Sequence, residues 1–138
     1  MRPTAGVVSG SLAVAVITAT LWIVPLIAAQ TASFRGAPPS EAQIKNPYQG
    51  NPQAAAAGKK LYGQNCAQCH GKELQGMGPA PGLDNPSTRS AKPGELFWFI
   101  TNGNLSGGMP SWAGLPKQQR WQIVTFLQSK IFAKSAAK

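Results

Sequence analysis

The sequence predicts an all-α fold, with a few helices that follow an N-terminal hydrophobic segment and a linker. Strand-like alternation of apolar and polar residues is nearly absent from the 138 residues, which counts against a β-rich protein. Apolar residues make up 43% of the chain, enough for one domain with an accessory segment, while 12 prolines and 15 glycines predict many loops. The predicted parts are a hydrophobic segment (1–29), a Pro/Gly-rich linker (30–51), a helical domain (52–134) and a tail (135–138).

The chain is strongly basic, with 13 Lys and Arg against four Asp and Glu and a net charge of +9. Such an excess predicts an anionic partner. The basic residues are spread along the chain without exposed aromatics or a reading helix beside them, so we do not expect a nucleic-acid partner. The charge instead favours an encounter with an acidic protein surface. Only two cysteines are present, which excludes a disulfide-knotted scaffold.

Residues 7–29 form an uncharged apolar stretch after Arg2 and the amino terminus. One interpretation is a signal peptide cleaved after Ala29, because small residues precede that point. The other is a retained membrane anchor, because about 18 apolar residues can span a bilayer. Either interpretation predicts an extracytoplasmic, periplasmic protein that is soluble in the first case and contacts the membrane through 7–29 in the second.

The linker shows no sustained helical or strand period and includes three prolines and two glycines within residues 36–50. This composition predicts an extended, semi-rigid spacer that would let a tethered domain reach away from a membrane.

The helical domain opens with clear start signals. Asn51 suits an N-cap and Pro52 the first helical position, and the alanines of 54–57 favour helix. Gly58 and Tyr62 lie four positions apart and therefore share a face. A glycine on that face predicts the close approach of another helix.

Two more helices are predicted in the second half of the domain. One covers 95–102, carries an apolar stripe and stops at Gly103. The other starts at Pro116 and carries an apolar stripe opposite Gln122, Thr125 and Ser129. The stripe residues are Leu96, Phe97 and Ile100 in the first helix and Ile123, Val124, Leu127 and Ile131 in the second.

The only cysteines and the only histidine of the chain lie together, in Cys66-Ala67-Gln68-Cys69-His70. C-x-x-C-H is the attachment sequence of haem c. Thiols three positions apart lie on one side of a helical turn and reach the two vinyl groups of one porphyrin. The imidazole of His70 then projects toward the iron as an axial ligand.

Other interpretations of this motif are weaker. Structural zinc needs four ligands, and the chain has no further Cys or His. A thioredoxin-like redox pair would lie in a βαβ context, which the sequence does not predict. A simple disulfide leaves His70 unexplained.

A second axial ligand is expected from a methionine. Met77 follows His70 by only seven residues, which places it on the same side of the haem. Met109 follows His70 by 39 residues, enough chain to wrap the macrocycle and return on the opposite face. Pro110 favours an extended backbone at Met109. We expect Met109 to be the ligand; the alternative is that it packs in the core.

Together these features resemble a monohaem class I c-type cytochrome over about residues 52 to 132. The resemblance implies one covalently bound haem c, a His70 ring that donates to the carbonyl of Pro79, and a Gly58/Tyr62 face that crosses the last helix. The matching features are Gly58-x-x-x-Tyr62, Cys66-x-x-Cys69-His70, Gly78-Pro79 followed by Leu83, a middle helix at 96–101, Met109-Pro110 and the aromatic-rich last helix.

The resemblance further implies an electron carrier rather than an enzyme, similar to small cytochromes that accompany periplasmic dehydrogenases. An iron held by His and Met has no open position, and thioether ligation raises its potential. The expected partners are acidic redox proteins: a dehydrogenase or other donor, and an oxidase or other cytochrome as acceptor. Lys59, Lys60 and Lys72 are candidates for the contact, and Arg89 and Trp112 for the haem propionates.

Two alternatives stay open from the sequence. One is a haem peroxidase or gas sensor, which needs Met109 to be labile or absent as a ligand. The other is a cytochrome subunit bound permanently in an oxidase or dehydrogenase complex.

Overall fold

The computed structural model describes residues 36–136, with side chains as far as Ile131. Within this range the chain forms helices joined by loops and no strand, apart from two isolated bridges between single residues. The predicted all-α class is confirmed. The elements are η2 (Glu41–Gln43), α1 (Pro52–Asn65), α2 (Ala67–His70), α3 (Pro86–Ser90), α4 (Pro93–Asn102), η3 (Leu105–Gly107) and α5 (Lys117–Ala136).

The predicted apolar stretch 7–29 lies outside the described residues. Within 36–136, none of the helices has both the length and the apolar character that crossing a bilayer requires.

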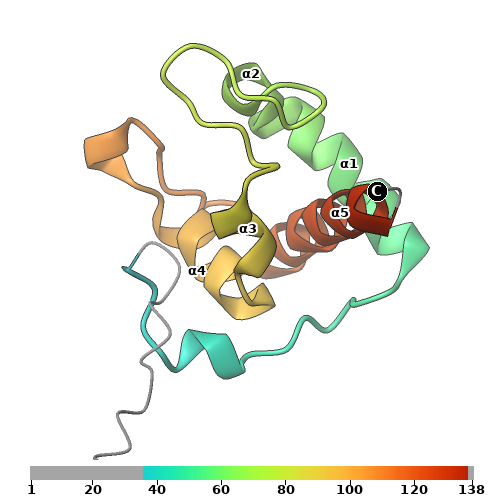
Figure 1. Cartoon of the computed structure of the whole chain (residues 1–138). Helices are drawn as coiled ribbons and strands as arrows, with labels where there is room; N and C mark the ends of the chain where they lie inside the picture. The colour runs from blue at the N-terminus through green and yellow to red at the C-terminus, as the bar shows by residue number, and fades with distance from the viewer. Residues whose placement is uncertain (1–35, 137–138) are drawn as a thin grey trace, which may run out of the picture. The chain divides into compact units, whose positions relative to one another are not determined.

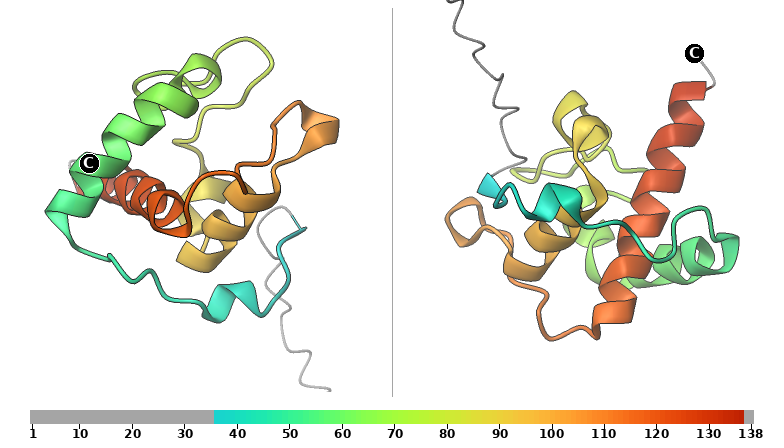
Figure 2. Two further views of the ribbon diagram at one scale, coloured as in Figure 1. Left: turned by 180° about the vertical axis from the view of Figure 1, so that it is seen from behind. Right: turned by 90° about the horizontal axis from the view of Figure 1, so that it is seen from below.

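The first and last helices pack across one another (Figures 1 and 2). Gly58 makes this approach possible, because a Cβ atom there would overlap the carbonyl oxygen of Gln122 on α5. One turn further along α1, Tyr62 packs on Phe126 with ring centroids 5.2 Å apart. The predicted contact between the Gly58/Tyr62 face and the last helix is confirmed.

The predicted helix ends agree closely with the structure. The Asn51 side chain accepts a hydrogen bond from the backbone N–H of Ala54 at 2.9 Å, which caps α1. Helix α4 begins at Pro93, two residues before the predicted start, and stops at Gly103, whose φ is +70°. Helix α5 begins at Lys117, directly after Pro116.

The core lies between α1, α4 and α5, and it contains most of the predicted stripe residues. Phe97 is only partly buried, but its ring stacks on Trp121 with centroids 4.2 Å apart. The fully buried members that close the core are Tyr62, Leu74, Ile123 and Val124.

Residues 36–51, here called the strap, run past α4 and α5 before entering α1 (Figures 1 and 2). The buried side chain of Asn46 donates hydrogen bonds to Thr125 Oγ1 at 3.0 Å and to Gln128 Oε1 at 3.1 Å. The backbone of Glu41 lies so close to Gly94 that a Cβ there would overlap its carbonyl oxygen. The extended spacer expected from the sequence is therefore wrong for these residues, although the boundary between linker and domain stays a prediction.

The strap also explains why Thr125 departs from the predicted pattern. Sequence periodicity places Thr125 opposite the apolar stripe of α5, yet only 3% of its surface is exposed. Its hydroxyl donates to Trp121 O and accepts from Asn46, so its polar atom is satisfied in the interior.

Candidate functional site

The two cysteines and the histidine lie on one helical turn. Helix α1 ends at Asn65, and the next residue, Cys66, donates its backbone N–H to Tyr62 O at 2.8 Å. The carbonyl of Cys66 then accepts the backbone N–H of His70 at 2.9 Å, so α2 is a single turn that starts there. The structure therefore brings together three predicted site residues, Cys66, Cys69 and His70.

The two sulfurs do not form a disulfide with each other; Cys66 is half-buried and Cys69 is exposed. Burial raises the pKa of Cys66 to about 11, and the negative charge that Cys69 can carry acts in the same direction. Before a thioether forms, the Cys66 thiol is therefore protonated near neutral pH. Among the described residues, no three Cys, His, Asp or Glu side chains are placed to hold one metal ion.

The His70 ring is held by a backbone carbonyl. Its Nδ1 lies 2.9 Å from the carbonyl oxygen of Pro81. Because a carbonyl oxygen can only accept, this bond places the proton on Nδ1. The lone pair of Nε2 is then available to a metal, as in other histidine ligands oriented through their second nitrogen.

The partner of this ring is Pro81, and the expectation of Pro79 is wrong. Met77 and Ala80 pair across a tight turn, with Ala80 N donating to Met77 O at 3.1 Å, so Pro79 lies inside the turn. The chain then returns and Leu83 N donates to Leu74 O at 2.8 Å. Leu83, two residues after Pro81, packs against the apolar core.

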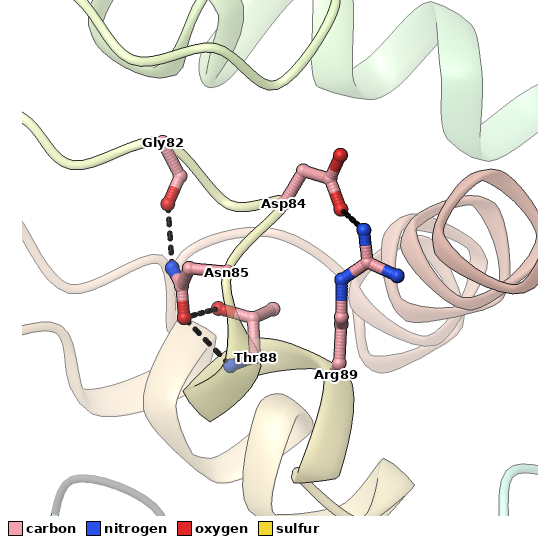
Figure 3. A network of polar contacts seen from close by, with 5 residues as sticks. All are labelled: Gly82, Asp84, Asn85, Thr88 and Arg89. Atoms are coloured by element: carbon pink, nitrogen blue, oxygen red, sulfur yellow. Dashed lines mark hydrogen bonds and ion pairs between the residues drawn. The ribbon is translucent and has the colours of Figure 1, made fainter. Parts of the chain in front are cut away.

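A polar network fixes the backbone just after Pro81 (Figure 3). The Asn85 amide donates to Gly82 O at 2.6 Å, and its oxygen accepts from Thr88 N at 3.0 Å to cap α3. Asp84 forms an ion pair with Arg89, the residue considered for a propionate. These bonds hold the segment that carries the His70 partner, while the propionate role of Arg89 stays a prediction.

Tyr62 supports the other side of the same turn. Its side chain is 2% exposed, and its hydroxyl donates to Gly71 O at 2.8 Å, directly after His70. Burial raises the pKa of Tyr62 well above its ordinary value, and Cys66 adds to this effect. The hydroxyl therefore stays protonated and keeps donating.

Tyr62→Phe is expected to cost about 1 to 2 kcal/mol of stability near neutral pH, because the Gly71 carbonyl loses a buried donor. The sign of the pH dependence follows from the raised pKa. The contribution is complete below the ordinary pKa of 10.0, and it declines at higher pH, where the unfolded chain ionises first. Denaturant unfolding of both proteins between pH 7 and 11 checks this.

Tyr48→Phe is the matched control, since Tyr48 is half-buried and lies in the strap. A stability difference between wild type and Tyr62→Phe that stays constant up to pH 11 would contradict the predicted linkage.

Met109 lies in a different element, the loop 103–112, here called the Met109 loop. Asn104 and Met109 exchange two backbone hydrogen bonds of 2.8 and 2.9 Å, which close the loop at its base. Gly103 lies so close to Pro110 that a Cβ would be 2.5 Å from its carbonyl carbon and oxygen. Figure 1 shows this loop projecting beside α4, apart from the loop that follows α2.

The second candidate methionine differs in its surroundings. Met77 is 53% exposed at the turn after α2, whereas Met109 is half-buried. Trp112, two residues past Pro110, packs against the core and donates its backbone N–H to Ile100 O at 3.1 Å. The surroundings favour Met109 over Met77 as the sulfur with a fixed position.

Sequence reasoning also missed a strained residue near the site. Leu74 has φ of +66° although it is not glycine, and it is fully buried. Such a conformation is uncommon for a bulky residue. The two backbone bonds to Gly71 and Leu83 hold it there, and no local pattern in the sequence indicates it.

The helical fold and the C-x-x-C-H turn with its carbonyl-held histidine define a c-type cytochrome. The chain belongs to the cytochrome c family described as "Cytochrome C oxidase, cbb3-type, subunit III", which matches residues 53–127.

Two sequence relatives support the assignment to this class of protein. Cytochrome c550 of Pseudomonas aeruginosa is 36% identical over 92 residues, which cover 62% of this chain and 61% of that protein. The cbb3-type oxidase subunit CcoP of Rubrivivax gelatinosus is 38% identical over 76 residues, 54% of this chain but only 23% of that subunit. The chain thus spans less than two thirds of each of these relatives.

A solved structure agrees as well. Cytochrome cL of Methylophaga aminisulfidivorans has a TM-score of 0.54 and 25% identity, with 68% of this chain and 71% of that chain covered. The predicted class I cytochrome fold is confirmed. So is the covalently attached haem c as cofactor.

Proposed function

We propose that this protein carries single electrons on one haem c held by four of its side chains. Cys66 and Cys69 would form the thioether bonds, and His70 and Met109 would bind the iron. The observation that carries the proposal is the bond between His70 Nδ1 and the Pro81 carbonyl, since it leaves Nε2 as a ready ligand. The bound haem supplies an iron that exchanges one electron between its ferrous and ferric forms.

The chain tunes this site through its own groups. The Pro81 carbonyl orients the His70 ring and makes it a stronger donor. A thioether from Met109 favours reduced iron and raises the potential. With His70 and Met109 both bound to the iron, the protein would be suited to electron transfer with little movement.

The partner is proposed to be an acidic redox protein. Without residues 1–29 the chain keeps 12 basic and four acidic residues, a formal charge of +8. Asp84 pairs with Arg89, Glu73 pairs with Lys130 at 2.8 Å, and Glu95 is buried. These ion pairs neutralise equal numbers of acidic and basic groups, so the excess of eight positive charges remains and supports fast, transient encounters with an acidic surface.

The exposed lysines 59, 60 and 72 are the proposed contact residues. The proposed electron donor is a periplasmic dehydrogenase or another redox protein. The proposed electron acceptor is an oxidase or another cytochrome. Two relatives support the oxidase as acceptor, because both are named as cbb3-type oxidase subunits: CcoP of Rubrivivax gelatinosus and FixP of a Bradyrhizobium strain. We further propose a periplasmic location, either anchored by residues 7–29 or soluble after cleavage.

A permanent place in an oxidase complex is a second candidate, because both of these relatives are named as oxidase subunits. Size-exclusion chromatography of detergent extracts distinguishes the two arrangements. A shuttle elutes alone, and a fixed subunit elutes with the oxidase.

The attachment proposal is tested with the Cys66→Ser, Cys69→Ser double variant, produced together with haem-maturation enzymes. Wild type is expected to keep its pigment on a denaturing gel and to have a mass increased by one haem. The double variant is expected to lose both, since no sulfur remains to form a thioether. The same mass spectrum shows whether the chain is cut after Ala29.

Each single variant serves as a control, because one remaining thiol can hold the haem by one bond. A wild-type polypeptide that migrates without pigment would overturn the proposal.

A further inference from the structure

The Met109 loop completes the C-terminal end of α4. The last carbonyl groups of any helix lack partners within the helix. In α4, Phe99 O accepts from Gly103 N at 2.7 Å, and Ile100 O accepts from Trp112 N at 3.1 Å. Thr101 O accepts from the Ser111 hydroxyl at 2.6 Å. The returning limb of the loop is therefore fixed to the end of a packed helix.

Thr101 is tied in turn to the start of α5. Its hydroxyl donates to Phe97 O at 2.7 Å and accepts from Arg120 Nη1 at 2.5 Å. The hydroxyl has one hydrogen, which it donates to the Phe97 carbonyl. Its oxygen can therefore only accept from the Arg120 guanidinium. A hydrogen bond from a charged donor is stronger than a neutral one.

Arg120 is itself held from three directions. Its Nε donates to Leu115 O at 3.1 Å, and its guanidinium lies 4.9 Å from the centroid of the Phe97 ring. That ring stacks on Trp121 in the core. The contacts thus run from the core through Arg120 to the Thr101 hydroxyl, and the main-chain carbonyl of the same residue accepts from Ser111, two residues from Met109.

We propose that Thr101, Ser111 and Arg120 form a clamp that positions Met109 and limits how readily its sulfur leaves the haem iron. The inference rests on the proposed ligation by Met109. Between Met109 and Ser111 stands only Pro110, whose φ is fixed by its ring and which packs on Gly103. Outward movement of the Met109 backbone is therefore opposed by the clamp and by the backbone pair with Asn104. All three are positioning residues, because none of them is a proposed ligand.

The clamp is tested with two matched substitutions in the haem-loaded protein, Thr101→Val and Thr125→Val. The two threonines make the same kind of contacts. Each donates to the carbonyl four residues earlier and accepts from a second side chain, Arg120 for Thr101 and Asn46 for Thr125. Thr125 faces the strap, so its loss lowers stability without touching the Met109 loop.

Three measurements are made on each protein: thermal unfolding, the thioether-to-ferric-iron absorption band, and the rate of carbon monoxide binding to the reduced form. Thr101→Val is expected to bind carbon monoxide about tenfold faster than wild type, the effect of losing one typical hydrogen bond. Its absorption band should also fade at a lower temperature. Thr125→Val should keep the wild-type rate, and Thr101→Ser should restore it because the hydroxyl returns.

Ser111→Ala, at an exposed position, gives the same test with little risk to folding and should also speed carbon monoxide binding. Equal rates for wild type, Thr101→Val and Ser111→Ala would overturn the clamp. So would equal acceleration by Thr101→Val and Thr125→Val, which would show a general effect of stability. A wild-type protein that lacks the thioether band would instead overturn ligation by Met109.

Discussion

Met109→Ala is expected to leave the haem attached, lower its reduction potential and open the iron to carbon monoxide. Attachment depends on the cysteines, so the pigment should stay with the polypeptide. Axial ligands cover a potential range of about 0.8 V, and loss of the thioether should move the potential by a substantial part of it, because thioether sulfur favours ferrous iron. Redox titration followed by optical spectroscopy measures the shift.

Met77→Ala is the control for this experiment, because Met77 is 53% exposed at a separate turn. Its potential and its response to carbon monoxide should match those of wild type. An unchanged potential in Met109→Ala, together with a lowered one in Met77→Ala, would mean that the ligand was assigned to the wrong methionine.

Gly58→Val is expected to destabilise the protein by about 3 kcal/mol or more, through overpacking against a helix backbone. The new Cβ would overlap the carbonyl oxygen of Gln122, and it would lie 3.0 Å from Phe126 Cβ. Backbone cannot rotate away as a flexible side chain can, so α1 and α5 have to separate. Denaturant unfolding of the haem-loaded protein measures the loss.

Gly63→Ala provides the comparison within the same helix. A Cβ at Gly63 meets no atom within 4 Å. Alanine is a better helix former than glycine by about 1 kcal/mol, so the stability should stay the same or rise. Similar losses in both variants would show that the effect at Gly58 is one of helix propensity and not of helix packing.

Features that depend on neighbouring residues could be predicted from the sequence. The Asn51 cap, the Gly103 stop and the C-x-x-C-H turn each follow from a few adjacent positions. The buried stripe of α5 follows from helical periodicity alone.

Features that depend on contacts between distant segments could not be predicted. The choice of Pro81 over Pro79 requires the pairing of Leu83 with Leu74. The strap requires the contact of Asn46 with Thr125, 79 residues away. No periodicity within one segment reports such contacts, because the pattern around one residue does not show which distant segment that residue will meet.

The strap has a practical consequence for anyone who wishes to transplant this module. The family match starts only at residue 53, so an excision guided by homology would discard Asn46 and the buried Ala37. Thr125 and Gln128 would then face solvent without their amide partner. A fusion or a shortened gene should therefore begin upstream of Ala37, so that the strap stays in the product and continues to cover α5.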